Sequence, residues 1–475
     1  MLKRVTPDRG SVPEIPSVRI ADADFPAPFR SGLEYSSPAR GTWNIVHTGM
    51  LIPQAHEIYA CGAGCLRGVI LTAAEMGTTD RFSTIAVREH NLLDGDMEEL
   101  IIEGVTDILN KLPVMPPAVL LYTSCIHHFT GTDLDMIYSE LRARFPEVDF
   151  TDCYMNPIMR KSGLTPDQLM RSRLYTLLHE RKINPGSAAI IGNDLPTDED
   201  SDLVRLLREA GLKIHEITAC RTYDEYQEMA ESPVYISYNT DAAPGGDMLE
   251  ERLGGKHHYM KLSFDYQEID EEFDSLAGVL EEHCSVGPDL GSGLRSVLEA
   301  IRTEGRKTAE EEIGKTLEMV GKTPVTIDYT FCQRPLGLAR LLLDRGFNVT
   351  SVYLDAIPGN DRKDFEYLRE AYPELMLHPT VHAGMRFANT ASKTAADSSR
   401  SEDMILAIGQ KAAYFCNTNH FVNIVEGGGM IGYEAVIRTM RLMRDAYETE
   451  KDMRSLVQVK GLGCEICLHQ EGEQR

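Results

Sequence analysis

The feature that most constrains the fold is a strand, helix, strand order that recurs three times along the chain. In its first occurrence, residues 82–87 have the apolar character of a strand, and residues 96–112 carry apolar side chains at helical spacing. Residues 118–122 form the next predicted strand, and the order starts again at 187–191 and at 325–330. Such repeats predict right-handed crossovers and parallel strand pairing.

The length of 475 residues is too great for one hydrophobic core, since single cores stop growing at about 250 to 300 residues. We therefore expect an α/β fold of three Rossmann-like open parallel-sheet domains behind an extended, proline-rich N-terminal arm. The expected parts are the arm at 1–45, a first domain at 46–184, a second domain with a helical connector at 185–322, and a third domain with a C-terminal tail at 323–475.

The charge of the chain excludes some classes of partner. A net charge of −25 and a pI near 5.0 argue against binding nucleic acid or an anionic membrane surface. No apolar run approaches the ~18 residues of a membrane span, and the first residues lack the apolar stretch of a signal peptide. We therefore expect a cytoplasmic protein. In that setting, ten cysteines indicate reduced thiols or metal ligation more than a disulfide framework.

Three of these cysteines form the candidate site. Cys61 and Cys65 lie in the glycine-rich segment 59–68, which we predict to be a turn whose glycines let the backbone approach a large inorganic ligand. Cys125 comes sixty residues after Cys65 and directly follows the apolar run 118–124. Thiolates gathered at strand ends suit iron-sulfur ligation. The alternative is that these are buried, unligated thiols, which are common in protein cores.

Other motifs carry less weight. Cys153, Cys220 and Cys332 also end or follow predicted strands, with no assigned role, and the Cys464 and Cys467 pair is a lone CxxC without a second pair. His127 and His128 could donate hydrogen bonds to cluster sulfurs or could simply open a helix. Residues 321–323 lack the glycine five positions earlier that a phosphate loop needs, so ATP is not expected to bind this chain. The glycines at 427–429 predict a tight loop.

These residues carry a family resemblance. The three α/β units, the leading arm, Gly64 with Cys65, the Thr123–Cys125 segment and the late segment from Gly432 to Glu434 resemble the component 1 proteins of the nitrogenase superfamily. The resemblance extends from about residue 36 to residue 445, and it is closest to a beta-type subunit of a nitrogenase-like reductase.

The resemblance implies an electron-relay role. A beta-type subunit shares an iron-sulfur cluster, of the P-cluster type (8Fe-7S) or a smaller 4Fe-4S centre, with an alpha-type sister subunit, usually in a heterotetramer. An ATP-hydrolysing iron protein delivers the electrons. Cys65 and Cys125 match the second and third family ligands, and the first falls on Thr42. Cys61 could restore the set. Whether the mate is a paralogue or another copy of this chain stays open.

The ligands of the family's active-site metallocluster do not match this chain. By alignment they fall on Tyr238 and Val422, with Cys220 and His420 as nearby fallback ligands. The complex metallocluster and the small-molecule substrate site are therefore expected mainly in the partner. The resemblance favours reductive carbon-sulfur cleavage of methylthio-alkanes. The alternatives are a tetrapyrrole reductase subunit, a dinitrogen-reducing nitrogenase subunit and a non-catalytic scaffold for metallocluster assembly.

Overall fold

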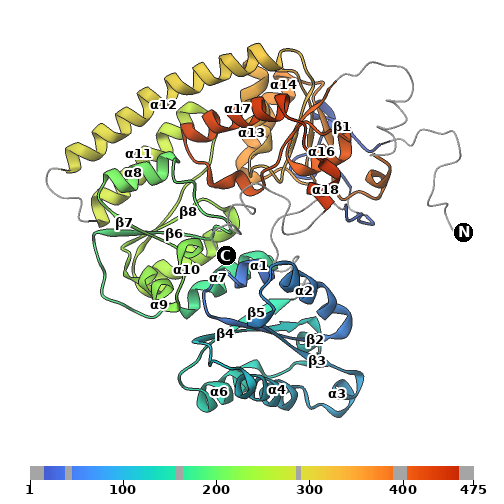
Figure 1. Cartoon of the computed structure of the whole chain (residues 1–475), viewed down its shortest axis with the longest axis vertical. Coiled ribbons are helices and arrows are strands. Elements are labelled where there is room, and N and C mark those ends of the chain that lie inside the picture. The colour runs from blue at the N-terminus through green and yellow to red at the C-terminus, as the bar shows by residue number, and fades with distance from the viewer. Residues whose placement is uncertain are drawn as a thin grey trace, which may run out of the picture.

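Three mostly parallel β-sheets, each with its own helices, make up the protein (Figure 1). The computed structural model describes residues 15–30, 32–37, 45–155, 164–284, 290–388 and 404–458. We refer to the parts of the chain that carry these sheets as the first, second and third units. The exact domain boundaries stay predictions. None of the helices in the described ranges combines the length and the apolar character needed to cross a membrane.

The first unit is a four-stranded parallel sheet in the order β3-β2-β4-β5. Both central strands are buried along almost their whole length, which explains their apolar composition. The strands are β2 (His56–Gly62), β3 (Phe82–Val87), β4 (Ala118–Ser124) and β5 (Asp149–Met155). The helices are α1 (Ile45–Gly49), α2 (Ala63–Glu75), α3 (Glu89–Asp94), α4 (Met97–Lys111), α5 (Cys125–Thr130), α6 (Leu134–Arg144) and α7 (Pro166–Leu174).

The second unit repeats this topology in the order β7-β6-β8-β9, again with all strands parallel. Its strands are β6 (Ser187–Ile191), β7 (Lys213–Glu216), β8 (Val234–Ser237) and β9 (Lys256–Tyr259), and its helices are α8 (Asp202–Glu209), α9 (Tyr223–Glu228) and α10 (Ala243–Leu253). The expected helical connector consists of α11 (Tyr266–His283) and α12 (Leu290–Val320). Figure 1 shows α12 running from the second unit along the third.

The third unit has the larger sheet, in the order β1-β12-β11-β10-β13-β14. Its strands are β10 (Val325–Asp328), β11 (Val349–Tyr353), β12 (Met376–His378), β13 (Leu406–Ile408) and β14 (Phe421–Val422), all parallel, and β1 (Val18–Arg19), which pairs antiparallel with β12. Its helices are α13 (Pro335–Asp344), α14 (Arg362–Ala371), α16 (Gln410–Cys416), α17 (Tyr433–Glu448) and α18 (Met453–Gln458).

The described part of the N-terminal arm lies on the third unit, in agreement with the prediction of an extended arm. β1 supplies the edge strand of the sheet, and Ile20, just after it, is fully buried. Further along, the Tyr35 backbone N–H donates to the Val381 carbonyl at 2.6 Å. The arm therefore covers β12, which would otherwise be an edge strand of the third sheet.

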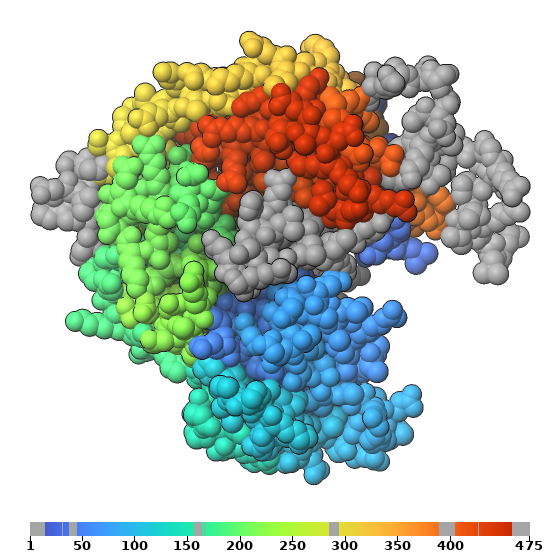
Figure 2. Space-filling model, in the orientation of Figure 1, coloured from blue at the N-terminus to red at the C-terminus, as the bar shows by residue number. Residues whose placement is uncertain are grey.

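The segment that bears Cys61 and Cys65 differs from the prediction of a glycine-rich turn. β2 continues to Gly62, and α2 begins at the next residue, so the strand passes directly into the helix. β2 lies in the middle of the sheet and was missing from the sequence-based assignment, because its first two residues, His56 and Glu57, are polar and its apolar run 58–61 was assigned to a glycine-rich turn. Figure 2 shows that the first unit, in blue to cyan, and the third unit, in orange to red, occupy separate regions of the molecule.

Candidate functional site

The three candidate cysteines lie at the topological switch point of the first sheet. The chain leaves β2 towards β3 on one side and returns to β4 on the other, so β2 and β4 are neighbours whose connections run in opposite directions. Cys61 is the penultimate residue of β2, Cys65 lies in the first turn of α2, and Cys125 opens α5 directly after β4. Open α/β sheets bind ligands in the crevice at this point.

The structure brings the three thiols into electrostatic contact. Burial, together with the nearby thiols of Cys65 and Cys125, raises the pKa of the Cys61 thiol to about 12. All three cysteines are free of disulfides. Within the described ranges, however, no three His, Cys, Asp or Glu side chains already stand in a metal-binding arrangement. The thiols are therefore neighbours whose sulfurs would have to turn towards a common centre.

The three cysteines differ in their access to the surface. Cys65 is exposed and Cys125 is half-buried, so both can present sulfur to a group that lies between this chain and another surface. Cys61 is 0% exposed and packs in the same core cluster as Leu66 and Tyr59. As a donor set, free thiols on adjacent strand ends fit an iron-sulfur cluster. Cys65 and Cys125 fit it without disturbing the core, whereas Cys61 would have to leave its packing.

The backbone around Cys125 is fixed by its neighbours. The Ser124 N–H donates to Nδ1 of His127 at 3.1 Å, which places the proton of the neutral ring on Nε2. Burial lowers the pKa of His127, so the ring is neutral near pH 7. Nδ1 of His127 therefore serves the helix start rather than a cluster sulfur. His128 is exposed and contacts Phe129, whose side chain is 72% exposed.

A buried polar group beneath the thiols was missed by the sequence analysis. Glu57 lies on the same face of β2 as Cys61, with Tyr59 between them, and burial raises its pKa well above the usual value. A Cβ atom at Gly49 would lie 2.1 Å from Glu57 Oε1 and 2.3 Å from the Tyr122 hydroxyl, so α1 is pressed closely onto this group. The available signal was a charged residue directly before the short apolar run 58–61.

The positions that match the family's metallocluster ligands are closed. Tyr238 is 5% exposed, and its hydroxyl lies 3.0 Å from Oγ1 of Thr197, which in turn donates to Glu216 at 2.8 Å. Val422 is fully buried in β14. A phenol held in a hydrogen-bonded cluster and an aliphatic side chain do not fit a metallocluster at this place.

The fallback ligands and the remaining cysteines do not converge on this place. The Cys220 thiol donates to the Glu216 carbonyl at 3.3 Å, whereas Nδ1 of His420 lies 3.1 Å from the Ala446 carbonyl at the end of α17. Cys332 is buried after β10. Thr42, Cys464 and Cys467 lie outside the described residues.

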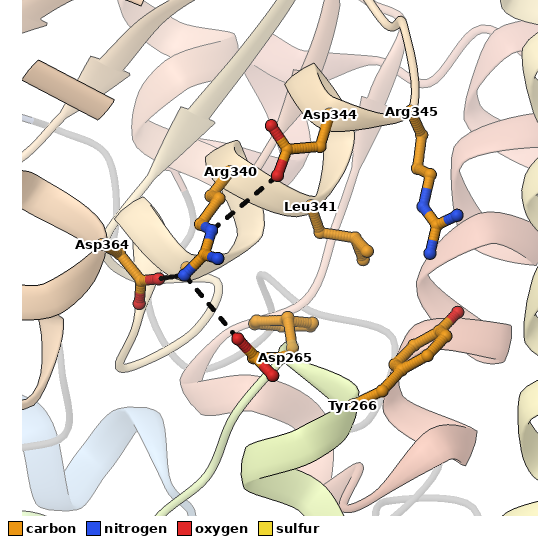
Figure 3. A pocket seen from close by; sticks show the side chains of 9 residues that line it. Asp265, Tyr266, Arg340, Leu341, Asp344, Arg345 and Asp364 are labelled. Atoms are coloured by element: carbon orange, nitrogen blue, oxygen red, sulfur yellow. Dashed lines mark hydrogen bonds and ion pairs between the residues drawn. The ribbon is translucent and has the colours of Figure 1, made fainter. Parts of the chain in front are cut away.

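A pocket of about 370 Å³ lies elsewhere, on elements of the second and third units (Figure 3). Arg340 projects into it and is compensated by Asp364 at 3.0 Å, Asp265 at 3.7 Å and Asp344 at 3.8 Å. None of its lining residues comes from the first unit, which holds the thiols. Because Arg340 is already paired with these carboxylates, we assign no ligand to this pocket.

Comparison with known protein families tests the family resemblance that was inferred from the sequence. The model of the nitrogenase component 1 type oxidoreductase family matches residues 46–449. The chain belongs to this family. The predicted superfamily is thereby confirmed, and membership indicates a nitrogenase-like oxidoreductase subunit. Nitrogenase component 1 proteins generally bind iron-sulfur clusters and assemble with partner subunits and an iron protein.

Solved structures of nitrogenase component 1 relatives share the fold. A structure of nitrogenase Cp1 at pH 6.5 is 14% identical with a TM-score of 0.59, and covers 88% of this chain and 94% of its own. A structure of nitrogenase Cp1 at pH 5 is 12% identical with a TM-score of 0.57, and covers 89% and 90%. At this identity the likeness establishes the predicted α/β architecture alone. Comparison with curated protein sequences gives no match.

Proposed function

We propose that this chain is the electron-relay subunit of a nitrogenase-like reductase, and that Cys61, Cys65 and Cys125 hold its iron-sulfur cluster. The observation that carries the proposal is the meeting of three free thiols at the switch point of the first sheet. When bound, the cluster supplies reversible one-electron storage. The chain supplies the thiolates, positions Cys125 through the Ser124 and His127 helix start, and excludes water from Cys61 by burying it.

The exposure of the thiols supports a cluster shared with a second subunit. Cys65 is exposed at the start of α2, and on the same helix Ile70 and Leu71 are 41% and 52% exposed. Exposed apolar side chains beside an incomplete ligand set are typical of a surface that a partner covers. We propose an alpha-type sister subunit in a heterotetramer as this partner, and an ATP-hydrolysing iron protein as the electron donor.

The cluster type and its ligand set remain part of the proposal. A shared P-cluster-type 8Fe-7S centre needs up to three thiolates from this chain, including Cys61. A 4Fe-4S centre with two ligands from each subunit would use Cys65 and Cys125 and leave Cys61 in the core. Because Cys61 is fully buried, its use as a ligand of the larger centre requires its side chain to leave its core packing.

The substrate site is proposed to lie mainly in the partner. The closed hydrogen-bonded cluster around Tyr238 supports this placement, because it occupies the position that matches a family metallocluster ligand. We propose reductive carbon-sulfur cleavage of methylthio-alkanes as the reaction, on the strength of the sequence resemblance. Tetrapyrrole reduction, dinitrogen reduction and a non-catalytic assembly scaffold are the outcomes from which the experiment has to separate it.

Metal analysis and turnover test the proposal in two steps. Anaerobically purified protein is expected to contain iron and acid-labile sulfide and to give an EPR signal on reduction. Protein without iron under these conditions would remove every redox role. In the second step the subunit, its sister subunit and the iron protein are supplied with ATP, dithionite and a thioether. Hydrocarbon and thiol products support the reductase, whereas cluster transfer without turnover supports the scaffold.

A further inference from the structure

The loop after β6 and the segment after β14 are held together where the second and third units meet. The Asp198 backbone N–H donates to the Gly429 carbonyl at 3.0 Å, and the Asp202 backbone N–H donates to the Ile431 carbonyl at 3.2 Å. We call this contact between residues 196–202 and 429–434 the seam. It joins two loops that are more than 200 residues apart in the sequence.

Two glycines make the close approach across the seam possible. A Cβ atom on Gly429, whose φ is +69°, would lie 2.3 Å from the Pro196 carbonyl oxygen and 2.7 Å from the Asp198 nitrogen. A Cβ atom on Gly432, whose φ is +81°, would lie 2.4 Å from Oδ2 of Asp202. Both positions need glycine for their conformation and for the contact.

Closing the seam removes two carboxyl groups from water. Oδ2 of Asp202 accepts hydrogen bonds from the backbone N–H groups of Tyr433 at 2.6 Å and Glu434 at 3.2 Å, at the start of α17. Asp202 is 6% exposed, and the Glu434 side chain is 19% exposed. Two carboxyl groups, one from each side of the contact, are therefore largely shielded from water near one another.

Charged groups on every neighbouring element act on this pair. The cations are Arg205 on α8, which acts on Asp202, and Arg441 on α17, which lies 3.7 Å from Glu434. Arg438 on the same helix pairs with Asp198 instead. The anions that repel Glu434 are Asp202, Asp200 and Glu312. Burial raises the pKa of Asp202 to about 6, although its two backbone hydrogen bonds and Arg205 lower it. Burial, with the repulsion from the neighbouring anions, raises the pKa of Glu434 to about 7.

We propose that the seam is a proton-controlled contact, which closes when Asp202 and Glu434 are protonated and loosens as they ionise. The sign follows from linkage. In the open state both carboxyls face water and have ordinary acidity, whereas in the closed state they hold their protons more tightly. Protons therefore favour closure. The advantage is complete at low pH and is lost as the pH rises through about 6 to 7.

The seam adjoins a hydrogen-bonded cluster at the second sheet. Thr197 lies against Gly429 in the seam, with its Cα 2.8 Å from a Cβ built on that glycine, and its hydroxyl also contacts Glu216 and Tyr238. This cluster lies where β6 and β8 end, which is the switch point of the second sheet. Loosening the seam exposes the cluster to solvent. No thiol of the first unit takes part, so the inference stands independently of the proposed cluster.

Hydrogen exchange of the full chain tests the seam directly. The protection of the peptide that contains Tyr433 and Glu434, corrected for the intrinsic exchange rate, is expected to fall about tenfold or more between about pH 5 and about pH 8. A peptide from α4, which is remote from the seam, serves as the internal control and is expected to keep its protection.

Two variants keep the test decisive. Asp202→Asn retains an acceptor oxygen but cannot ionise, and Glu434→Gln removes the second charge near the surface. Each is expected to reduce the dependence of protection on pH, and the double variant to abolish it. If Asp202→Asn does not fold, Glu434→Gln alone decides. Unchanged pH dependence in the variants, or parallel loss of protection in α4, would overturn the inference.

Discussion

Tyr59 and Tyr122 stack face to face, with ring centroids 4.1 Å apart and ring planes 5° apart. They are directly paired residues of β2 and β4. Tyr59 lies two positions before Cys61, and its side chain is on the same face of the sheet. Both are fully buried or nearly so. The stacked rings therefore pack together on one face of the two strands that lead to the candidate thiols.

Removing one of these stacked rings is expected to lower the stability of the fold. Tyr122→Ala removes a buried ring and should lower the free energy of unfolding by about 3 to 5 kcal/mol. Tyr122→Phe keeps the ring and loses the hydroxyl, which donates to the Ile45 carbonyl at 3.1 Å, and should cost about 1 kcal/mol. Urea unfolding followed by circular dichroism measures both. Equal stability of the two variants would show that the ring does not support the sheet.

Arg334 is expected to be the most sensitive charged residue between the second and third units. Its guanidinium, 3% exposed, binds Glu268 at 2.7 Å, Asp361 at 3.1 Å and Asp364 at 2.5 Å. Arg334→Ala leaves the buried Asp361 without its cation and removes one of the cations that pair with Glu268 and Asp364, so it should cost about 3 to 5 kcal/mol of unfolding free energy. The matched control is Lys111→Ala.

Lys111 also forms an ion pair, with Asp107 at 2.7 Å, but its side chain is 73% exposed. Because exposed pairs contribute about 0 to 1 kcal/mol, this variant should unfold nearly like the parent. Thermal unfolding of the parent and both variants at one pH makes the comparison. A similar shift for Arg334→Ala and Lys111→Ala would contradict the account of the buried network.

Gly429 is expected to be irreplaceable for a steric reason. Gly429→Ala places a methyl group 2.3 Å from the Pro196 carbonyl oxygen, in addition to the strain of a positive φ. Gly77 has a similar φ of +70°, but nothing lies within 4 Å of a Cβ built there. Gly77→Ala should therefore cost about 1 kcal/mol, and Gly429→Ala clearly more. Equal losses in chemical unfolding would mean that the close approach is absent in solution.

Glu57 predicts a specific dependence of stability on pH. Burial raises the pKa of this carboxyl well above its usual value, so the stability tied to its neutral form is complete at low pH and is lost as the pH rises. Glu57→Gln cannot ionise. Its stability relative to the parent should grow by about 1.4 kcal/mol per pH unit above about pH 4.5, up to the pKa of the folded state.

The control for this prediction is Glu75→Gln, an exposed position at the end of α2. Denaturant midpoints of the parent and the two variants are compared from mildly acidic to mildly alkaline pH. The Glu57→Gln curve should diverge from the parent curve, while the Glu75→Gln curve should follow it. Parallel curves for all three proteins would show that Glu57 is charged in the folded state.

Much of the fold followed from local patterns. Residues 82–87 and 187–191 were predicted as strands and form β3 and β6 in full, because β-branched and apolar runs bounded by polar residues carry a clear signal. The helix predicted over residues 96–112 forms α4 over Met97–Lys111, because its apolar side chains recur at helical spacing. The antiparallel β1 was not foreseen, because two residues carry no period.

The candidate site was only partly visible in the sequence. Cys125 could be assigned to a strand end and Cys65 to a glycine-rich turn, but their meeting at one switch point depends on the order of β2 and β4 in the sheet, which no local pattern encodes. The burial of Cys61 was not predicted, because β2 itself was not assigned as a strand. Tertiary context decided these features.

The most direct test of the central claim is the iron content of cysteine variants. Anaerobically purified Cys125→Ala is compared with Cys284→Ala, which removes a thiol buried in the second unit that contacts the Ser187 carbonyl instead. Folding of both is checked by circular dichroism. The account predicts that Cys125→Ala loses most of its iron and its EPR signal, while Cys284→Ala keeps the parent iron content. Full iron in folded Cys125→Ala would contradict it.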